Sequence, residues 1–114
     1  MAQVLISEPH ADVRGLFEHM VARLGHNPVP VTALTQDAVT SADLLLVEPA
    51  DPAGAALARL AQELRPTLPI VCASIAPPSL ELGLIPTACL LKPFSLAELR
   101  ATLDRALAGK STVA

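Results

Sequence analysis

The stretch DLLLVE, residues 43–48, decides the fold of this chain. Its four central residues are all apolar, so no alternation of polar and apolar side chains marks a face exposed to water. A strand of a parallel sheet that helices cover on both faces has a continuous apolar run of this kind. The stretch therefore predicts a central strand of a parallel sheet over residues 43–48.

Other stretches of strand length lie on both sides of it. Three of them are short and mostly apolar: QVLIS (3–7), PIVCAS (69–74) and CLLK (89–92). A fourth, NPVPVTAL (27–34), is weaker, because Pro28 and Pro30 have no backbone N–H and suit only an edge strand. The sequence thus predicts five strands, with residues 27–34 at an edge of the sheet.

The first connections between these strands are expected to contain helices. In residues 11–25 the apolar side chains recur every three or four positions: Val13, Leu16, Phe17, Met20, Val21 and Leu24. Gly25 is placed to end this helix in the left-handed conformation. TQDAVTSA (35–42) holds at most a second, short helix.

Two longer patterns follow in the second half of the chain. Residues 52–66 present an apolar face of Leu57, Leu60, Ala61 and Leu64 and end at Pro66. Residues 95–109 begin with a capping box of Ser95 and Glu98, end at Gly109 and have an apolar face: Leu96, Leu99, Leu103 and Leu107. Between them, three prolines and a glycine in residues 75–88 make any helix over 79–85 short or irregular.

The alternation of strands and helices predicts an open parallel α/β sheet with helices on both faces. A length of 114 residues fits one domain, expected over residues 1–109, with residues 110–114 as a tail or the start of a linker. In sheets of this kind ligands bind beyond the carboxyl ends of the strands, where the strand order switches.

The composition excludes several classes of protein. A hydrophobic content of 52% excludes a disordered tail, and a net charge of −3 with only two aromatic residues does not suit a nucleic-acid binder. No apolar run approaches the roughly 20 residues of a membrane span, and the N-terminus does not resemble a signal peptide. We therefore expect a cytoplasmic protein with no direct contact to nucleic acid or membrane.

The two cysteines, Cys72 and Cys89, both lie in apolar stretches without Cys-x-x-Cys spacing or a nearby histidine. This context favours buried free thiols over a disulfide or a zinc site.

Polar side chains stand where the predicted strands end. They are Ser7 and Glu8 after the first strand, Glu48 after the third, Ser74 after the fourth and Lys92 after the fifth. Each of these side chains could be polar simply because strand ends are exposed to solvent, without any function. The set favours a site at one edge of the sheet, because Lys92 is one of only two lysines and Pro93 would fix its backbone direction.

These residues together resemble the receiver domains of two-component response regulators. VLISEPHADVR is similar to the receiver opening, where a strand leads into an acidic pair, and DLLLVEPADPAG resembles the strand of the phosphoacceptor aspartate, with Pro52 and Gly54 in the following loop. PIVCAS ends in the matching hydroxyl residue, Ser74, and CLLKPFSLAEL is similar to the Lys-Pro-Phe segment and the last helix. The resemblance covers essentially the whole chain.

The resemblance implies a flavodoxin-like (CheY-like) three-layer sandwich, with a five-stranded parallel sheet of order 2-1-3-4-5. The fourth crossover, residues 75–88, is shorter and richer in proline than in the family, so we expect a shortened or irregular fourth helix there. It implies a pocket in which an acidic pair and an aspartate bind Mg²⁺ and a histidine kinase phosphorylates the aspartate. It also implies a bond between Lys92 and Pro93 that is usually cis, and a switch that couples the hydroxyl residue to an aromatic side chain in the last strand.

Three positions depart from the family pattern. Glu48 occupies the phosphoacceptor position, where its extra methylene moves the carboxylate toward the site of the phosphoryl group. Glu8 matches the first member of the acidic pair, but Pro9 replaces the second. Since Mg²⁺ requires a near-ideal octahedron of oxygen ligands, we expect no metal, or at best weak binding through Glu8 and Glu48. Cys89 replaces the aromatic residue, so the switch-equivalent residues are Ser74 and Cys89.

The departures predict a pseudo-receiver that is not an enzyme, needs no cofactor and signals through protein contact, with a face around residues 75–107 as the candidate surface. Glu48 and Lys92 would form a permanent ion pair; if it is buried, removing one partner would cost ~3 to 5 kcal/mol. The expected partner is a protein of the histidine kinase or output-domain class, and homodimerisation is left open.

Two alternatives remain from the sequence: a receiver that is still weakly phosphorylated, and a small-ligand sensor that uses the crevice at the strand ends. A hydrolase triad is disfavoured because no Gly-x-Ser-x-Gly motif surrounds Ser74. Nucleotide binding is disfavoured because no glycine follows the first strand. We interpret His10 as a solvated loop residue and the arginines as solvated helix residues.

Overall fold

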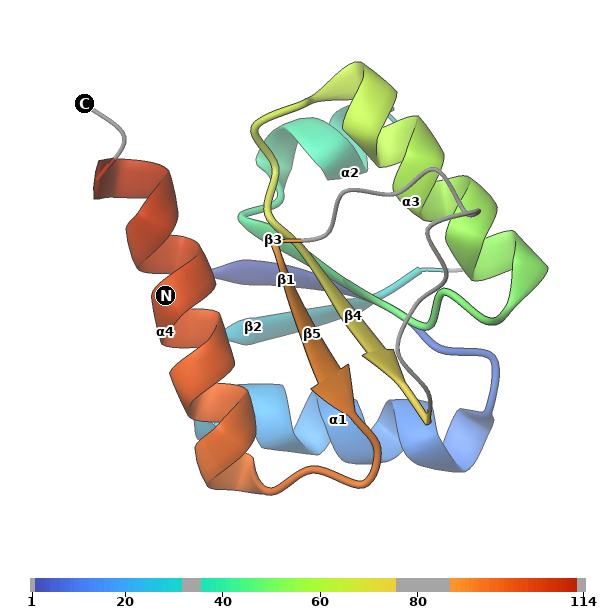
Figure 1. Ribbon diagram of the computed structural model, residues 1–114, viewed down its shortest axis with the longest axis vertical. Coiled ribbons are helices and arrows are strands. Elements are labelled where there is room, and N and C mark those ends of the chain that lie inside the picture. Colours follow the sequence, from blue (N-terminus) through green and yellow to red (C-terminus); the bar gives the residue numbers. More distant parts are fainter. Residues whose placement is uncertain (1, 32–35, 76–86, 113–114) are drawn as a thin grey trace.

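The computed structural model describes residues 2–31, 36–75 and 87–112, which form a five-stranded parallel sheet with helices on both faces (Figure 1). The strands are β1 (Gln3–Ser7), β2 (Asn27–Pro30), β3 (Leu44–Val47), β4 (Ile70–Ser74) and β5 (Ala88–Leu91). Their order in the sheet is β2-β1-β3-β4-β5, and every neighbouring pair is parallel. The predicted flavodoxin-like topology is confirmed, with β3 in the centre and the proline-containing β2 at an edge.

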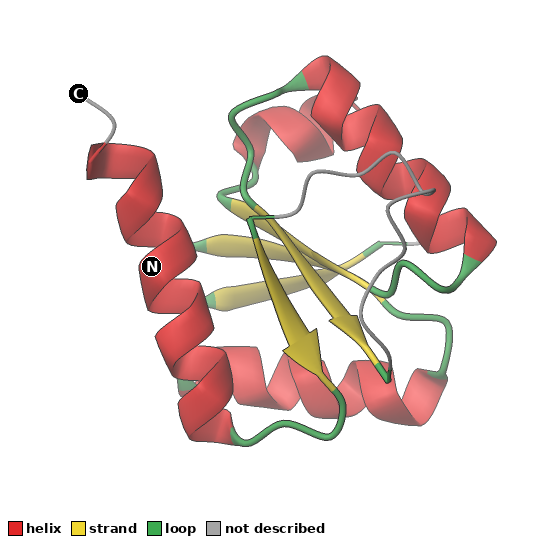
Figure 2. Cartoon of the chain, viewed as in Figure 1, coloured by secondary structure: helices red, strands yellow, loops and turns green. Residues whose placement is uncertain are grey.

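Four helices connect or follow these strands: α1 (Ala11–Arg23), α2 (Gln36–Ser41), α3 (Pro52–Leu64) and α4 (Leu96–Thr112). Helices α1 and α4 lie on one face of the sheet, and α2 and α3 lie on the other, which gives the three-layer sandwich (Figure 2). The fourth crossover, for which the sequence predicts a short or irregular helix over 79–85, lies outside the described residues.

The apolar run of β3 is explained by these two layers. Leu44 and Leu46 point into the cluster under α1 and α4, whereas Leu45 and Val47 point into the cluster under α2 and α3. All four side chains are at most 1% exposed. Because successive side chains of a strand point to opposite faces, a strand buried on both sides has no polar position in its middle.

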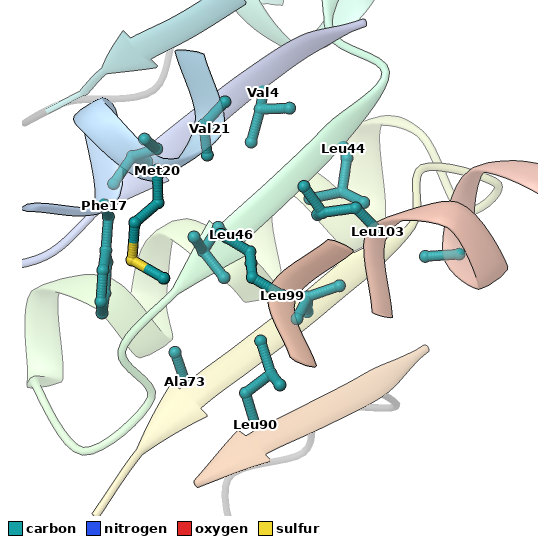
Figure 3. Close-up of a cluster of buried hydrophobic side chains, with 13 residues drawn as sticks. Val4, Phe17, Met20, Val21, Leu44, Leu46, Ala73, Leu90, Leu99 and Leu103 are labelled. Atoms are coloured by element: carbon teal, nitrogen blue, oxygen red, sulfur yellow. The ribbon is translucent and has the colours of Figure 1, made fainter. Parts of the chain in front are cut away.

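The first of these clusters is built from large side chains (Figure 3). Phe17 and Met20 of α1 and Leu99 and Leu103 of α4 pack over the central strands, and Leu90 joins them from β5. The predicted apolar face of the last helix is therefore confirmed. In α1 the prediction is wrong for Leu16, which is 54% exposed.

Helix α3 packs differently from its predicted apolar face. Leu60 and Leu64 are 40% and 46% exposed, and the residues of α3 that are buried are small: Gly54, Ala55, Ala58 and Ala61. A Cβ atom on Gly54 would lie only 2.5 Å from the carbonyl oxygen of Glu48. The helix backbone therefore approaches the end of β3 so closely that leucines cannot face the sheet.

Several helix ends follow the sequence, and others differ. Gly25 has a φ of +87°, as the predicted left-handed position requires. Ser95 and Glu98 form the predicted capping box, with hydrogen bonds of 3.1 Å in both directions. The last helix continues past Gly109 to Thr112, so Gly109 does not end it and residues 110–112 are helical.

The start of α3 also differs from the expected loop. Pro52 and Gly54 belong to the first turn of the helix, and the Asp51 carboxylate caps it by accepting a hydrogen bond of 3.1 Å from the Gly54 N–H. Arg65, expected in solvent, donates to the carbonyl oxygens of Val39 and Ala42 at the end of α2. Among the described helices, none is long and apolar enough to cross a membrane.

Candidate functional site

The site lies at the carboxyl ends of β1, β3 and β5, where backbone hydrogen bonds continue past the strands. The Glu48 N–H donates to the Ser7 carbonyl oxygen at 3.1 Å, and the Lys92 N–H donates to the Ser74 carbonyl oxygen at 2.8 Å. These bonds hold the residues that follow the strands in the register of the sheet. The polar residues of the strand ends are thereby placed at one edge, as predicted.

Lys92 connects the two glutamates. Its ammonium forms an ion pair with Oε1 of Glu8 and a second one with Oε1 of Glu48, where the Nζ to Oε1 distance is 3.1 Å. The expected pair of Glu48 and Lys92 is therefore part of a larger group of three side chains. We call Glu8, Lys92 and Glu48 the ion triad.

The ion triad is largely shielded from water. The side chain of Glu8 is 1% exposed, that of Glu48 is 11% exposed and that of Lys92 is 15% exposed. The second oxygen of each carboxylate is also bonded: Oε2 of Glu8 accepts from the His10 N–H, and Oε2 of Glu48 accepts from the Ala50 N–H, both at 3.2 Å. All four carboxylate oxygens therefore have a partner within the chain.

Burial and bonding act in opposite directions on Glu8. Burial raises the pKa of its carboxyl group, but hydrogen bonds and charge attraction from Lys92 and hydrogen bonds from His10 outweigh it. The net result is a Glu8 pKa below the ordinary value for glutamate. Glu8 is thus a buried carboxylate that stays ionised because a cation is bound to it.

An aromatic pair supports the cation of the ion triad. The Lys92 ammonium lies 5.6 Å from the centre of the Phe17 ring, within the usual range of a cation–π contact. Phe17 stacks on Phe94, with ring centres 5.1 Å apart. The sequence places Phe17 on an apolar helix face and Phe94 in the Lys-Pro-Phe segment, but it does not predict their stacking beside Lys92; the one available signal is that Phe94 follows Lys92 by two positions.

Two residues beside the triad, both predicted to be solvated, also make hydrogen bonds to Glu8. The His10 side chain is 77% exposed, yet its Nδ1 lies 3.3 Å from Oε2 of Glu8. Arg14 donates from Nη1 to the Glu8 carbonyl oxygen at 3.1 Å. Their positions at the start of α1, just after Glu8, bring both residues back over the strand end.

The remaining predicted residues lie around the triad without belonging to it. Ser74 is buried at the end of β4, Pro9 and Pro93 are exposed, and the peptide bond between Lys92 and Pro93 is cis. Cys89 is exposed on β5, which contradicts the expectation of a buried thiol, whereas Cys72 is buried as expected. β5 is an edge strand, as the predicted strand order requires, and the apolar residues next to Cys89 do not bury its side chain there.

An open crevice of about 690 Å³ lies over the triad. Its lining combines loop, helix and strand-end residues: Pro9, His10, Val13, Glu48, Ala50, Asp51, Pro52, Ile75 and Lys92. A second, mostly apolar hollow of about 320 Å³ adjoins it on the side of α1 and shares Val13, Ile75 and Lys92 with the crevice.

The two carboxylates at the strand ends are already paired with a cation of the chain itself. Among the described residues, no group of three or more histidine, cysteine, aspartate or glutamate side chains is arranged to hold an ion. The Lys92 ammonium lies between the only two carboxylates of the triad. A divalent ion would have to displace this ammonium, so the residues do not fit the Mg²⁺ that the fold family implies.

Comparison with known proteins identifies the fold. No protein-family model matches the sequence, and no curated protein matches it significantly. The structure is similar to NtrX from Brucella abortus, with a TM-score of 0.78 and 20% identity over 96% of this chain but only 27% of NtrX. The chain therefore spans about a quarter of the length of that protein.

Two shorter proteins match along their whole length. A response regulator receiver domain from Clostridium thermocellum has a TM-score of 0.78 and 14% identity, with 100% of both chains covered. A response regulator receiver protein from Sinorhizobium medicae has a TM-score of 0.74 and 25% identity over 96% of each chain. The chain has the fold of response regulator receiver domains.

Proposed function

We propose that this chain is an atypical receiver domain that signals through protein contact and does not depend on phosphorylation. The observation that carries the proposal is the ion triad, in which one ammonium pairs with both Glu8 and Glu48. Glu48 stands at the position of the phosphoacceptor, and its carboxylate is already bonded at both oxygens. No aspartate stands there to form an acyl phosphate.

The ion triad contains a cation of the chain itself, the Lys92 ammonium, where the family pattern has Mg²⁺. In the family pattern a divalent ion binds the carboxylates of the pocket, whereas Lys92 already provides a positive charge to both carboxylates here. Two carboxylates and one ammonium leave a net charge of −1, so added Mg²⁺ would gain little attraction and would have to break formed bonds. We infer that the domain needs no cofactor and binds Mg²⁺ weakly at best.

The same bonds support a single, fixed conformation. Replacement of an ion pair by an apolar group can leave stability unchanged, whereas removal of one partner leaves the other charge buried and unpaired. The triad connects the ends of three strands, so its plausible contribution is to hold these strand ends in one arrangement. A receiver held in this way would present one signalling surface at all times and would catalyse no reaction.

The surface for a protein partner is proposed near the site. Ile75 is 81% exposed just after β4 and Leu16 is 54% exposed on α1, and both line the mostly apolar hollow beside the crevice. Clusters of exposed apolar side chains are commonly used in protein contacts. We propose a partner of the histidine kinase or output-domain class and no direct contact with nucleic acid.

The test is a phosphorylation assay with a small phosphodonor such as acetyl phosphate and Mg²⁺. We expect no stable incorporation of phosphate into the wild-type chain. Stoichiometric, Mg²⁺-dependent labelling that is lost in Glu48→Ala would overturn the proposal and would favour the alternative of a weakly phosphorylated receiver. Glu48→Asp is the matched comparison, since it retains the charge and shortens the side chain.

A second candidate, a small-ligand sensor, is favoured by the crevice of about 690 Å³ over the triad. Its lining contains both apolar residues and the charged ends of Glu48 and Lys92. A thermal-shift screen of small anionic and neutral metabolites tests it. A compound that raises the melting temperature of the wild-type chain, but not that of Lys92→Met, would support a sensor.

A further inference from the structure

The two cysteines, which are distant in the sequence, are neighbours in the sheet. Cys72 of β4 and Cys89 of β5 are partners in the register of these parallel strands. Neighbouring strands lie about 4.8 Å apart, which is within the Cα separation of about 4.4 to 6.8 Å that a disulfide requires. Register partners of parallel strands point to the same face, so both thiols lie on the side of the sheet that α3 covers.

The two thiols have unequal surroundings. Cys72 is 1% exposed and belongs to the core cluster under α2 and α3, whereas Cys89 is exposed on the edge strand. The pKa of Cys72 is raised to about 12, chiefly by burial and to a smaller extent by the neighbouring Cys89 side chain and the charge of Glu48. The two residues are neighbours in the register of the strands, and a reagent in solution reaches the exposed Cys89 first.

We propose that Cys89 is a modification site for small disulfides and that Cys72 then closes an intramolecular disulfide with it. In the first step the Cys89 thiolate attacks one sulfur of glutathione disulfide. The bond between the two glutathione sulfurs breaks, one glutathione leaves as a thiolate and takes up a proton, and Cys89 carries a mixed disulfide.

In the second step the Cys72 sulfur loses its proton and attacks the Cys89 sulfur. The mixed disulfide breaks and the second glutathione leaves. Overall, the two protein thiols are oxidised to one disulfide and one glutathione disulfide is reduced to two glutathione thiols, so atoms and electrons balance. Cys72 is slow to ionise, but it attacks from the neighbouring strand, where its local concentration is far higher than that of any thiol in solution.

The bond would change the connection between two strands of the site. Cys72 precedes Ser74 by two positions on β4, and Cys89 precedes Lys92 by three positions on β5. A disulfide would therefore fix β4 to β5 close to the residues that end both strands. The inference rests on the register and exposure of the two cysteines and is independent of the proposed signalling function.

The experiment treats the folded chain with glutathione disulfide and follows its intact mass and its free thiols. We expect the wild-type chain to lose both thiols and two hydrogen atoms without retaining glutathione. Cys72→Ala is expected to stop at a stable adduct of one glutathione on Cys89, and Cys89→Ser is expected not to react. The Cys89→Ser change lies at an exposed position, so it leaves the core intact.

Two results would overturn the inference: a wild-type chain that retains the glutathione adduct to the same extent as Cys72→Ala, or one in which neither thiol reacts while the chain is folded. If Cys72→Ala does not fold, a peptide map of the oxidised wild-type chain without reductant decides the same question. That map either contains a peptide linked between Cys72 and Cys89 or contains each cysteine separately. None of these measurements involves a partner protein or a phosphodonor, so the result does not depend on the outcome of the phosphorylation assay.

Discussion

The two faces of the sheet hold the site by different means. On one face, α1 and α4 pack through large side chains, and the Phe17 ring of this layer lies against the Lys92 ammonium. On the other face, α3 packs through glycine and alanine, and its backbone comes within contact of the Glu48 carbonyl group. One partner of the ion triad is therefore positioned by the bulk of side chains, and another by close approach of the backbone.

The comparison shows which kind of substitution each face should tolerate. A layer of large side chains is sensitive to loss of volume, because a cavity remains where atoms are removed. A layer of small residues is sensitive to added volume, because no space is left for another methyl group.

The largest effect is expected from Leu103→Ala in α4. The Leu103 side chain is completely buried in the cluster under α1 and α4, so its truncation leaves a cavity and should lower the free energy of unfolding by about 2 to 5 kcal/mol. Urea denaturation measures the loss. Leu60→Ala in α3 is the control: Leu60 is 40% exposed, and its loss should cost less than about 1 kcal/mol. Equal losses in the two variants would contradict the difference between the faces.

The second largest loss of stability is expected from Lys92→Met in the ion triad. Lys92→Met removes the cation and leaves the buried Glu8 carboxylate beside Glu48. Removal of one partner from a fully buried pair costs about 3 to 5 kcal/mol, and the partial exposure of Glu48 and Lys92 should reduce this loss to about 2 to 3 kcal/mol. Chemical denaturation at neutral pH provides the measurement.

The control for this substitution is Arg105→Met, which removes a positive charge from an exposed position of α4. It should change the free energy of unfolding by less than about 0.5 kcal/mol. If the Lys92 variant were as stable as the Arg105 variant, the triad would not stabilise the strand ends.

The third effect uses two glycines that differ in the space around them. Gly54→Ala would place a methyl group 2.5 Å from the Glu48 carbonyl oxygen, so α3 must move and stability should fall by about 1 to 2 kcal/mol. Gly15→Ala in α1 meets no atom within 4 Å and should instead stabilise the chain by about 0.5 to 1 kcal/mol. Thermal unfolding of both variants distinguishes them by the sign of the change. A stabilising Gly54→Ala would show that α3 does not need its close approach.

The smallest effect is the dependence of stability on pH through Glu8. Its pKa is lowered in the folded chain, because Lys92 and His10 outweigh the opposing effect of burial. A carboxyl group with a lowered pKa stabilises the fold above its unfolded pKa, about 4.3 for glutamate, and this contribution is lost as the pH falls through the folded value. The stability difference between wild type and Glu8→Gln should therefore be constant from pH 7 to about 5 and diminish below about pH 4.

Urea denaturation at several pH values checks this expectation, with Glu63→Gln as the matched variant at an exposed position of α3. Its difference from wild type should be small at every pH. A Glu8 difference that grows on acidification would mean that the folded chain holds this carboxyl group protonated.

The topology and three members of the site could be predicted from the sequence for a simple physical reason. A continuous apolar run such as residues 43–48 has few structural solutions, and the carboxyl ends of parallel strands lie at one edge of a sheet. Glu8, Glu48 and Lys92 could therefore be brought together without coordinates. The role of Glu8 as a second partner of Lys92 could not, because it depends on side-chain directions that a linear pattern does not contain.

Other differences arise from packing distance and register. Helical spacing selected Leu60 and Leu64 as the buried face of α3, but spacing does not reveal how closely a helix approaches the sheet. The neighbouring positions of Cys72 and Cys89 depend on the register of β4 and β5, which follows from the length and path of the connection between them. A local sequence pattern contains neither the distance between a helix and the sheet nor the register of two strands.

The prolines of β2 have a consequence for self-association. Asn27 and Val31 donate their N–H groups to the carbonyl oxygens of Ala2 and Ile6 on the side of β1. Because N–H groups alternate in direction along a strand, Pro28 and Pro30 occupy the outward positions. The outer border of β2 therefore lacks the donors that another polypeptide would need in order to extend the sheet. β5, at the opposite border, contains no proline, so each of its residues retains a backbone N–H.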